Sequence, residues 1–211
     1  MGWYERRVLP ILLEKMMTGT ETERLRKDAL KPARGRVLEI GCGTGLNVPH
    51  YPAAVTHLVG LDPNAGMETI ARRRLAAAPV KGEFVLGRGD NRLPFEDASF
   101  DTVVTTFVLC TVGDAEHALS EIRRVLKPSG QYLLLEHGLA PDAAVQRWQR
   151  RLNRVNRLAL GGCNLNRPIA RLVVGAGFTL QASIEFFQAG APKFAGFTTS
   201  AIAIATSSPP A

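Results

Sequence analysis

The sequence predicts an α/β protein with a seven-stranded, mostly parallel sheet, an antiparallel last strand and helices on both faces. Three observations support this prediction. Apolar, β-forming runs alternate with helical segments, which is the pattern of a parallel sheet covered on both sides. The first run, residues 36–40, leads directly into a turn with three alternating glycines within residues 41–45. The last two runs, 179–186 and 194–205, have no helix between them, so the final strand is expected to run antiparallel.

The individual elements follow from local patterns of apolar residues and helix breakers. The expected strands cover residues 36–40, 55–61, 83–86, 101–108, 131–136, 179–186 and 194–205. The expected helices cover residues 3–17, 63–78, 114–126, 143–160 and 168–175, with a short helix after the glycine turn. Pro63 is well placed to open its helix, because proline suits the first helical position. The segment Pro128-Ser-Gly130 is a typical helix stop. Residues 18–34 are expected to form a polar segment.

Length and composition predict one globular domain. The chain has 211 residues, of which 45% are hydrophobic and 21% charged, enough for one full core. We expect a helical cap or lid over residues 1–34, a catalytic core over 35–206 and a tail over 207–211. No apolar run reaches the ~18 residues of a membrane span, and no signal peptide is recognisable. Three scattered cysteines fit a reducing cytoplasm, and since no pair has zinc-ligand spacing, we expect no metal.

The net charge of +7 is unevenly distributed. Basic residues cluster ahead of the first strand and again within residues 147–157, on an amphipathic helix. These residues could form solvated helix faces, a lid, or a peripheral contact with an anionic membrane. Nucleic acid is not an expected partner, because aromatic and base-reading motifs are missing. The sequence leaves the oligomeric state open.

The glycine turn and a later acid indicate a nucleoside site. Glycines let the backbone turn sharply and approach a ligand closely. Seventeen residues past Gly45, at the end of the second expected strand, Asp62 can accept hydrogen bonds from both hydroxyls of a ribose. The dinucleotide pattern G-x-G-x-x-G does not fit, since its third glycine position holds Leu46 or Val48.

The G-x-G-x-G spacing, with Glu39 two residues ahead of it, resembles the first motif of class I S-adenosylmethionine-dependent methyltransferases. Further motifs extend the resemblance, namely Gly89–Pro94, Ser99–Asp101 and Arg124–Gly130. The resemblance implies a Rossmann-like class I methyltransferase fold with S-adenosyl-L-methionine as the cofactor.

The resemblance also implies where the cofactor would lie. Its methionyl ammonium would lie near Glu39 and Gly41, its carboxylate near backbone N–H groups, and its adenine amino group near Asp90. The predicted cofactor-binding residues are Glu39, Gly41, Cys42, Gly43, Gly45, Asn47, Asp62, Pro63, Asp90, Asn91, Phe107 and Cys110.

Two strand ends carry the candidate catalytic residues. His137 is placed for general base work near pH 7, next to Glu136, and both are predicted to be catalytic. His137 could instead be a hydrogen-bonded structural residue, and Cys110 a buried small hydrophobe. The predicted substrate pocket comprises Tyr4, Cys110, His137, Trp148 and Asn164, with the turn-rich loop 161–167 closing over it.

A narrower resemblance concerns the acceptor. Residues 107–112, Glu136-His137 and residues 162–167 are similar to the methyltransferase-like thiol methyltransferases of vertebrate microsomes and their bacterial relatives. The vertebrate members carry a membrane anchor, which we do not expect in this chain. The similarity implies methyl transfer to a small nucleophilic acceptor such as a thiol. Two alternatives remain: a phospholipid amine N-methyltransferase at the membrane surface, and a non-catalytic cofactor-binding protein.

Overall fold

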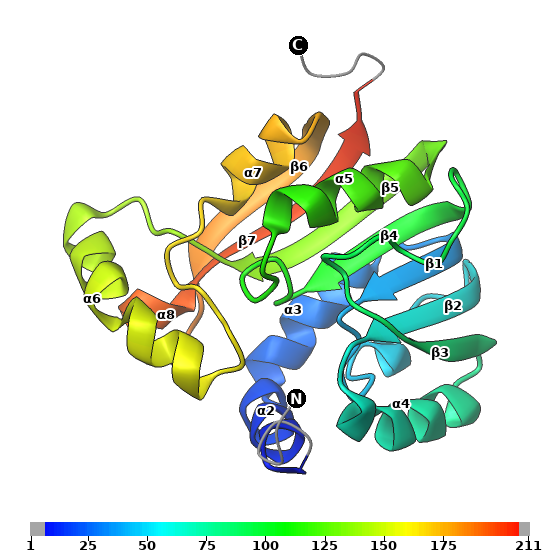
Figure 1. Cartoon of the computed structure of the whole chain (residues 1–211), viewed down its shortest axis with the longest axis horizontal. Helices are drawn as coiled ribbons and strands as arrows, with labels where there is room; N and C mark the ends of the chain where they lie inside the picture. The colour runs from blue at the N-terminus through cyan, green and yellow to red at the C-terminus, as the bar shows by residue number, and fades with distance from the viewer. Residues whose placement is uncertain (1–6, 207–211) are drawn as a thin grey trace.

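The computed structural model describes residues 7–206, which form a seven-stranded sheet with helices on both faces (Figure 1). The strand order is β3-β2-β1-β4-β5-β7-β6. The strands are β1 Gly35–Ile40, β2 Val55–Asp62, β3 Gly82–Leu86, β4 Phe100–Thr106, β5 Leu126–His137, β6 Phe178–Phe187 and β7 Phe197–Ala205. β7 pairs antiparallel with both of its neighbours, and the other pairs are parallel. The predicted fold class, including the antiparallel last strand, is confirmed.

The helices differ from expectation mainly near the N-terminus. They are α2 Leu9–Met17, α3 Thr20–Leu30, α4 Ala65–Ala77, α5 Ala115–Val125, α6 Ala143–Ala159, α7 Ile169–Gly175 and α8 Lys193–Gly196, with a short 3-10 helix η1 at Val48–His50. The polar segment over 18–34 contains a helix, α3, whose bounds the sequence analysis did not predict. Only Leu25, Arg26 and Leu30 of α3 are buried, so its apolar periodicity is weak. The first part of the predicted helix 3–17 lies outside the described residues.

Side chains of the central strands point alternately to the two faces of the sheet and form two hydrophobic cores. Leu38 and Ile40 of β1 point to one face, where they join the inward side chains of α5 and α7. Val37 points to the other face and joins buried side chains of α3 and α4. This two-residue period is the ordinary geometry of a strand with both faces covered. Glu39 shares the face of Val37, so its carboxylate lies on the α3 side of the sheet.

The register brings the carboxyl ends of the parallel strands to one edge. Ile40 pairs with Leu61 of β2 and Thr105 of β4, so these three strands end at the same level. The fourth strand is shorter than the predicted 101–108, because Phe107 takes a left-handed conformation with φ +59° and breaks the ladder. The last strand starts at Phe197 rather than residue 194, since residues 193–196 form α8.

Helix α6 stands apart from the sheet, as Figure 1 shows. Gln149 is its inward residue, donating to Gly138 O at 3.0 Å and accepting from Ala140 N at 3.1 Å. Trp148, Val155 and Leu158 are 55%, 64% and 78% exposed, which leaves an apolar strip among the arginines of this helix. Across residues 7–206, the structure contains no helix with the length and apolarity that a bilayer crossing requires.

The loop between β3 and β4 is fixed by one buried acid. Glu121 of α5 accepts a hydrogen bond from Leu93 N at 2.7 Å and from Arg124 Nη2 at 2.6 Å. Arg124 in turn donates to the carbonyl oxygens of Leu93 and Phe95. This network holds the loop that carries Asp90 against the sheet.

We predict that Glu121→Ala lowers the free energy of unfolding by about 2–3 kcal/mol, because a backbone N–H and a guanidinium lose their acceptor. Glu68→Ala is the control, since Glu68 pairs with Arg72 on an exposed helix face and should cost only about 0.3–0.5 kcal/mol. Urea unfolding of both variants measures the difference, and equal losses would contradict this account.

Candidate active site

A cavity of about 560 Å³ opens at the carboxyl edge of the sheet. This edge is where open α/β sheets bind ligands. Its walls come from the glycine turn after β1, the ends of β2 and β5, the loops after β3, β4 and α6, and helices α2 and α3. The lining therefore combines segments that lie far apart in the sequence.

The glycine turn has the backbone that the sequence predicts. Gly41 and Gly43 have φ values of +66° and +55°, in the left-handed region that favours glycine. A Cβ on Gly41 would collide with the side chain of Val108, whereas a Cβ on Gly43 would meet nothing within 4 Å. Gly43 thus leaves room for a ligand at the centre of the turn.

Asp62 ties this turn to the end of β2. Its carboxylate accepts hydrogen bonds from Gly43 N at 2.9 Å and Asn64 N at 2.8 Å. Burial raises the pKa of Asp62, although these two N–H groups oppose the shift. Because a carboxylate has about four acceptor sites, capacity remains for hydroxyl groups of a ligand.

Glu39 lies at the floor of the cavity in a polar cluster. Its two oxygens accept from Asn47 Nδ2 at 2.9 Å and from Tyr51 OH at 2.8 Å. Burial raises the pKa of Glu39 to about 7, against the opposing effects of Tyr51, Arg26 and Asn47. A cationic group in the cavity would favour the charged form of this acid.

Arg26 of α3 supplies a positive charge next to Glu39. The side chain is 6% exposed, and its Nη1 donates to Asn47 Oδ1 at 2.9 Å. Its Nε is buried with no hydrogen-bond partner among the described residues, although the residue lines the cavity. A buried donor without an acceptor is costly, so this atom favours a ligand that brings an anionic oxygen.

Helix α2 closes over the glycine turn. Glu14 accepts hydrogen bonds from the Thr44 hydroxyl and the Arg74 guanidinium, and Arg74 Nη1 also donates to Thr44 O at 2.9 Å. These contacts join α2, the glycine turn and α4 across the mouth of the cavity.

Asp90 lies on the cavity wall, in the loop after β3. Arg88 donates to both of its oxygens at 3.0 Å, and Gly113 N donates to Oδ2 at 2.9 Å. Burial alone would raise the pKa of Asp90, but Arg88 and Gly113 hold it below its ordinary value. Asp90 therefore stays a hydrogen-bond acceptor at the cavity wall.

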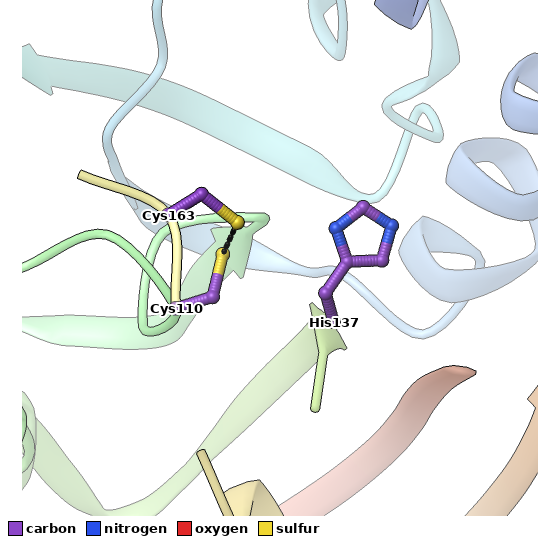
Figure 2. A group of neighbouring side chains, drawn as sticks. All are labelled: Cys110, His137 and Cys163. Carbon is purple, nitrogen blue, oxygen red and sulfur yellow. Dashed lines mark hydrogen bonds between the residues drawn. The ribbon is translucent and has the colours of Figure 1, made fainter. Parts of the chain in front are cut away.

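Three side chains that line the cavity lie close together, as Figure 2 shows: Cys110, His137 and Cys163. The two Sγ atoms are 3.6 Å apart, and the His137 ring lies 4.5 Å from the Phe107 ring between centroids. The pKa of the Cys163 thiol is lowered by hydrogen bonding from Cys110 and then by His137, whereas that of Cys110 is raised. Cys163 is therefore the sulfur of this pair that ionises first.

Glu136 has a different position from the one predicted for a catalytic acid. It is fully buried outside the cavity lining, and its carboxylate accepts from Val108 N at 3.0 Å and Cys110 N at 3.4 Å. The side chain points into the turn after β4 because those backbone groups need an acceptor. It shapes the site without facing it.

The structure brings ten of the predicted residues to the cavity. They are Glu39, Gly41, Cys42, Gly43, Asp62, Pro63, Asp90, Phe107, Cys110 and His137. The cavity also takes in residues that the sequence analysis missed, including Glu14, Met17, Arg26, Thr44, Asn64, Met67, Arg88 and Cys163. Two of them stood in motifs that had been singled out: Thr44 in the glycine turn and Cys163 within residues 162–167.

Other predicted residues do not line the cavity. Gly45 packs near Val48 and Ala71, Asn47 lies behind Glu39, and Asn91 is exposed. Trp148 lies outside because the inward position of α6 belongs to Gln149, and its exposed ring contacts Arg151. Asn164 lies behind Cys110 and donates to its carbonyl oxygen at 2.9 Å. Tyr4 is outside the described residues.

Similarity to known proteins agrees with this site. Residues 38–134 match the family model of the methyltransferase domain. The chain is 36% identical to the thiol S-methyltransferase TMT1A of Homo sapiens over 146 residues, 68% of this chain and 59% of that protein. It is 36% identical to a phosphatidylethanolamine N-methyltransferase of Cereibacter sphaeroides over 133 residues, 61% of this chain and 65% of that protein. The chain thus spans less than two thirds of either relative.

A solved structure shows the same fold. Geranyl diphosphate methyltransferase in complex with S-adenosylmethionine superimposes with a TM-score of 0.68, covering 97% of this chain and 91% of that one. At 16% identity, this likeness concerns the fold alone.

We predict that Asp62→Ala weakens the binding of S-adenosylhomocysteine about 10- to 100-fold, as expected for the loss of hydrogen bonds to a charged acceptor. Asp101→Ala is a matched control. Asp101 accepts from Arg36 N at 2.8 Å at the opposite edge of the sheet, so its loss should reduce stability without changing affinity. Calorimetry on both variants tests this, and an unchanged affinity for Asp62→Ala would refute the ribose position.

We predict opposite effects of pH on the stability of the free protein and on its affinity for S-adenosylhomocysteine. The Glu39 pKa of about 7 lies above the ordinary 4.5, so between these values the folded state holds a proton that the unfolded state has lost. The Glu39 contribution to stability therefore falls by about 2–3 kcal/mol as the pH rises from 4.5 through 7.

Affinity should instead rise between pH 6 and pH 8, because the ammonium of the ligand favours the carboxylate. Glu39→Gln should flatten both profiles, as measured by urea unfolding and calorimetry at pH 5, 6 and 8. A variant that kept the pH dependence of wild type would show that another group causes it.

Proposed function

This chain belongs to the class I S-adenosylmethionine-dependent methyltransferases, and from that premise we propose that it methylates a small thiol. The observation that carries the proposal is the cluster of His137 and two cysteines in the lining of the cavity. The similarity to a thiol S-methyltransferase supports the same acceptor class.

The residues of the cavity fit S-adenosyl-L-methionine. Glu39 would hold its ammonium, Asp62 its ribose hydroxyls and Asp90 its adenine amino group. The buried Nε of Arg26 offers a donor for its carboxylate, in addition to the backbone N–H groups of the turn. When bound, the sulfonium supplies an activated methyl group that a nucleophile can displace in line.

The chain has three tasks in this reaction. The strand ends and the glycine turn hold the reacting groups in one orientation, which is worth much of the barrier in a displacement. Phe107, Val108 and the loop 160–163 line the cavity and limit the access of water. The cluster at His137 stabilises the acceptor as a thiolate, since the thiolate is the nucleophilic form.

Free thiols also suggest where the protein acts. Cys42, Cys110 and Cys163 are all unbridged, although two of their sulfurs lie near one another. We propose the cytoplasm, because a reducing compartment keeps such a pair as thiols.

A second candidate is a phospholipid amine N-methyltransferase. The exposed Trp148, Val155 and Leu158 on the arginine-rich α6 form a surface suited to an anionic bilayer. A hollow of about 610 Å³ beside them is lined by Arg150, Arg154 and Arg157, which would favour phosphate groups. The similarity to a phosphatidylethanolamine N-methyltransferase agrees with this alternative.

We predict that the purified full chain, given S-adenosylmethionine and a panel of alkyl and aryl thiols, yields S-methyl products. Mass spectrometry of the products is the readout. Phosphatidylethanolamine in anionic vesicles is the competing acceptor in the same assay. Methylation of the lipid amine without any thiol product would replace the proposal by the second candidate. Binding of S-adenosylhomocysteine without any turnover would instead indicate a non-catalytic cofactor-binding protein.

A further inference from the structure

We propose that Cys110, His137 and Cys163 bind one zinc ion and leave a fourth coordination position open toward the cavity. The three side chains come from the turn after β4, the end of β5 and the loop after α6. Their ligand atoms all lie within 4.8 Å of one another. No spacing rule along the sequence identifies such a set, because Cys110 and Cys163 are 53 residues apart.

The spacing of the sulfurs favours a metal over a disulfide. Two thiolates on a tetrahedral zinc with Zn–S bonds of about 2.3 Å stand roughly 3.8 Å apart, whereas a disulfide needs about 2.05 Å. The observed distance between the two Sγ atoms is 3.6 Å. The pair therefore already has the separation that the ion requires.

His137 is oriented as a ligand. Its Nε2 lies 3.4 Å from Gln188 Nε2, and Gln188 is held by Thr198 Oγ1 at 2.9 Å. The other ring nitrogen faces the two sulfurs (Figure 2). With an ion on that nitrogen, the ring proton lies on Nε2, so the Gln188 amide must turn its oxygen toward Nε2 to become the acceptor that orients such histidines.

The two cysteine loops are fixed to one another. Asn164 donates to Cys110 O from its backbone N at 2.7 Å and from Nδ2 at 2.9 Å, and Asn156 Nδ2 donates to Cys163 O at 2.8 Å. The sulfurs thus have a preformed separation rather than one that loop motion sets. Asn164, expected to line the substrate pocket, gains a positioning role here.

The charges nearby are mixed but leave the site suited to a cation. The carboxylate of Glu136 accepts from Cys110 N, and Arg167 donates to the carbonyl oxygen of Leu109. Two thiolates would neutralise the ion itself. Two sulfurs and one imidazole are a ligand set that suits zinc, and three protein ligands with one open position are typical of its reactive sites.

The open position gives the site a role that rests on the proposed function. An acceptor thiol that coordinates there loses its S–H proton to solvent as the Zn–S bond forms. Its sulfur lone pair then forms the new S–CH₃ bond, and the old bond breaks with its electron pair returning to the cofactor sulfur. In this arrangement His137 is a ligand rather than a general base.

The test is a metal titration of the full chain, stripped with a chelator and kept reduced with a phosphine. Cobalt(II) should bind one per chain with the visible absorption of a tetrahedral thiolate site, and zinc should displace it. Cys163→Ser should weaken zinc binding by more than about 100-fold, because it removes one of the three ligands. Cys42→Ser should still bind one ion, because Cys42 lies outside the cluster. Circular dichroism establishes that each variant is folded.

Two results would overturn the proposal. One is cobalt binding that Cys163→Ser leaves unchanged. The other is a metal-free protein that methylates thiols at the full rate, which would leave His137 as the base. Zinc binding with no thiol methylation under any condition would instead support the site and refute the proposed function. The experiments therefore distinguish a failure of the zinc site from a failure of the proposed thiol methylation.

Discussion

The buried carboxylate of Glu136 fixes the turn after β4, and the shape of the cavity depends on this contact. Phe107 leaves the strand in a left-handed conformation, which frees the backbone N–H groups that follow it. Glu136, on the neighbouring strand β5, accepts hydrogen bonds from two of these groups, Val108 N and Cys110 N. These contacts bring Cys110 toward the end of β5. Without such an acceptor, these buried N–H groups would each cost about 1–3 kcal/mol.

Carboxylates that accept hydrogen bonds from loop N–H groups occur at two further places along the carboxyl edge of the sheet. Asp62 accepts a hydrogen bond from Gly43 N, and Asp90 accepts one from Gly113 N, so acids also fix the glycine turn and the loop before α5. Two of these three acids, Asp62 and Asp90, also line the cavity. Arg26 and Arg88 offset part of this negative charge.

Much of the fold and part of the site could be predicted because their signals are local. The glycine turn, Asp62 and the antiparallel last strand each follow from a short run of sequence. Helix α3 could not, since three inward residues in a polar segment give no periodic signal, and Arg26 was missed with it. The approach of Cys163 to Cys110 and His137 is set by the packing of loops that lie far apart in the chain. Trp148 was placed wrongly because an amphipathic stripe does not indicate which of its sides faces the protein.

The contacts of Glu14 have a kinetic consequence. A carboxylate from α2 spans Thr44 and Arg74 at the entrance, so a ligand seated on the glycine turn is enclosed by the N-terminal helix. Release of the product nucleoside and binding of new cofactor then require the contacts of Glu14 with Thr44 and Arg74 to break. The rate at which these contacts open would limit turnover. Substitutions near residue 14 would then change kcat without contacting the reacting atoms.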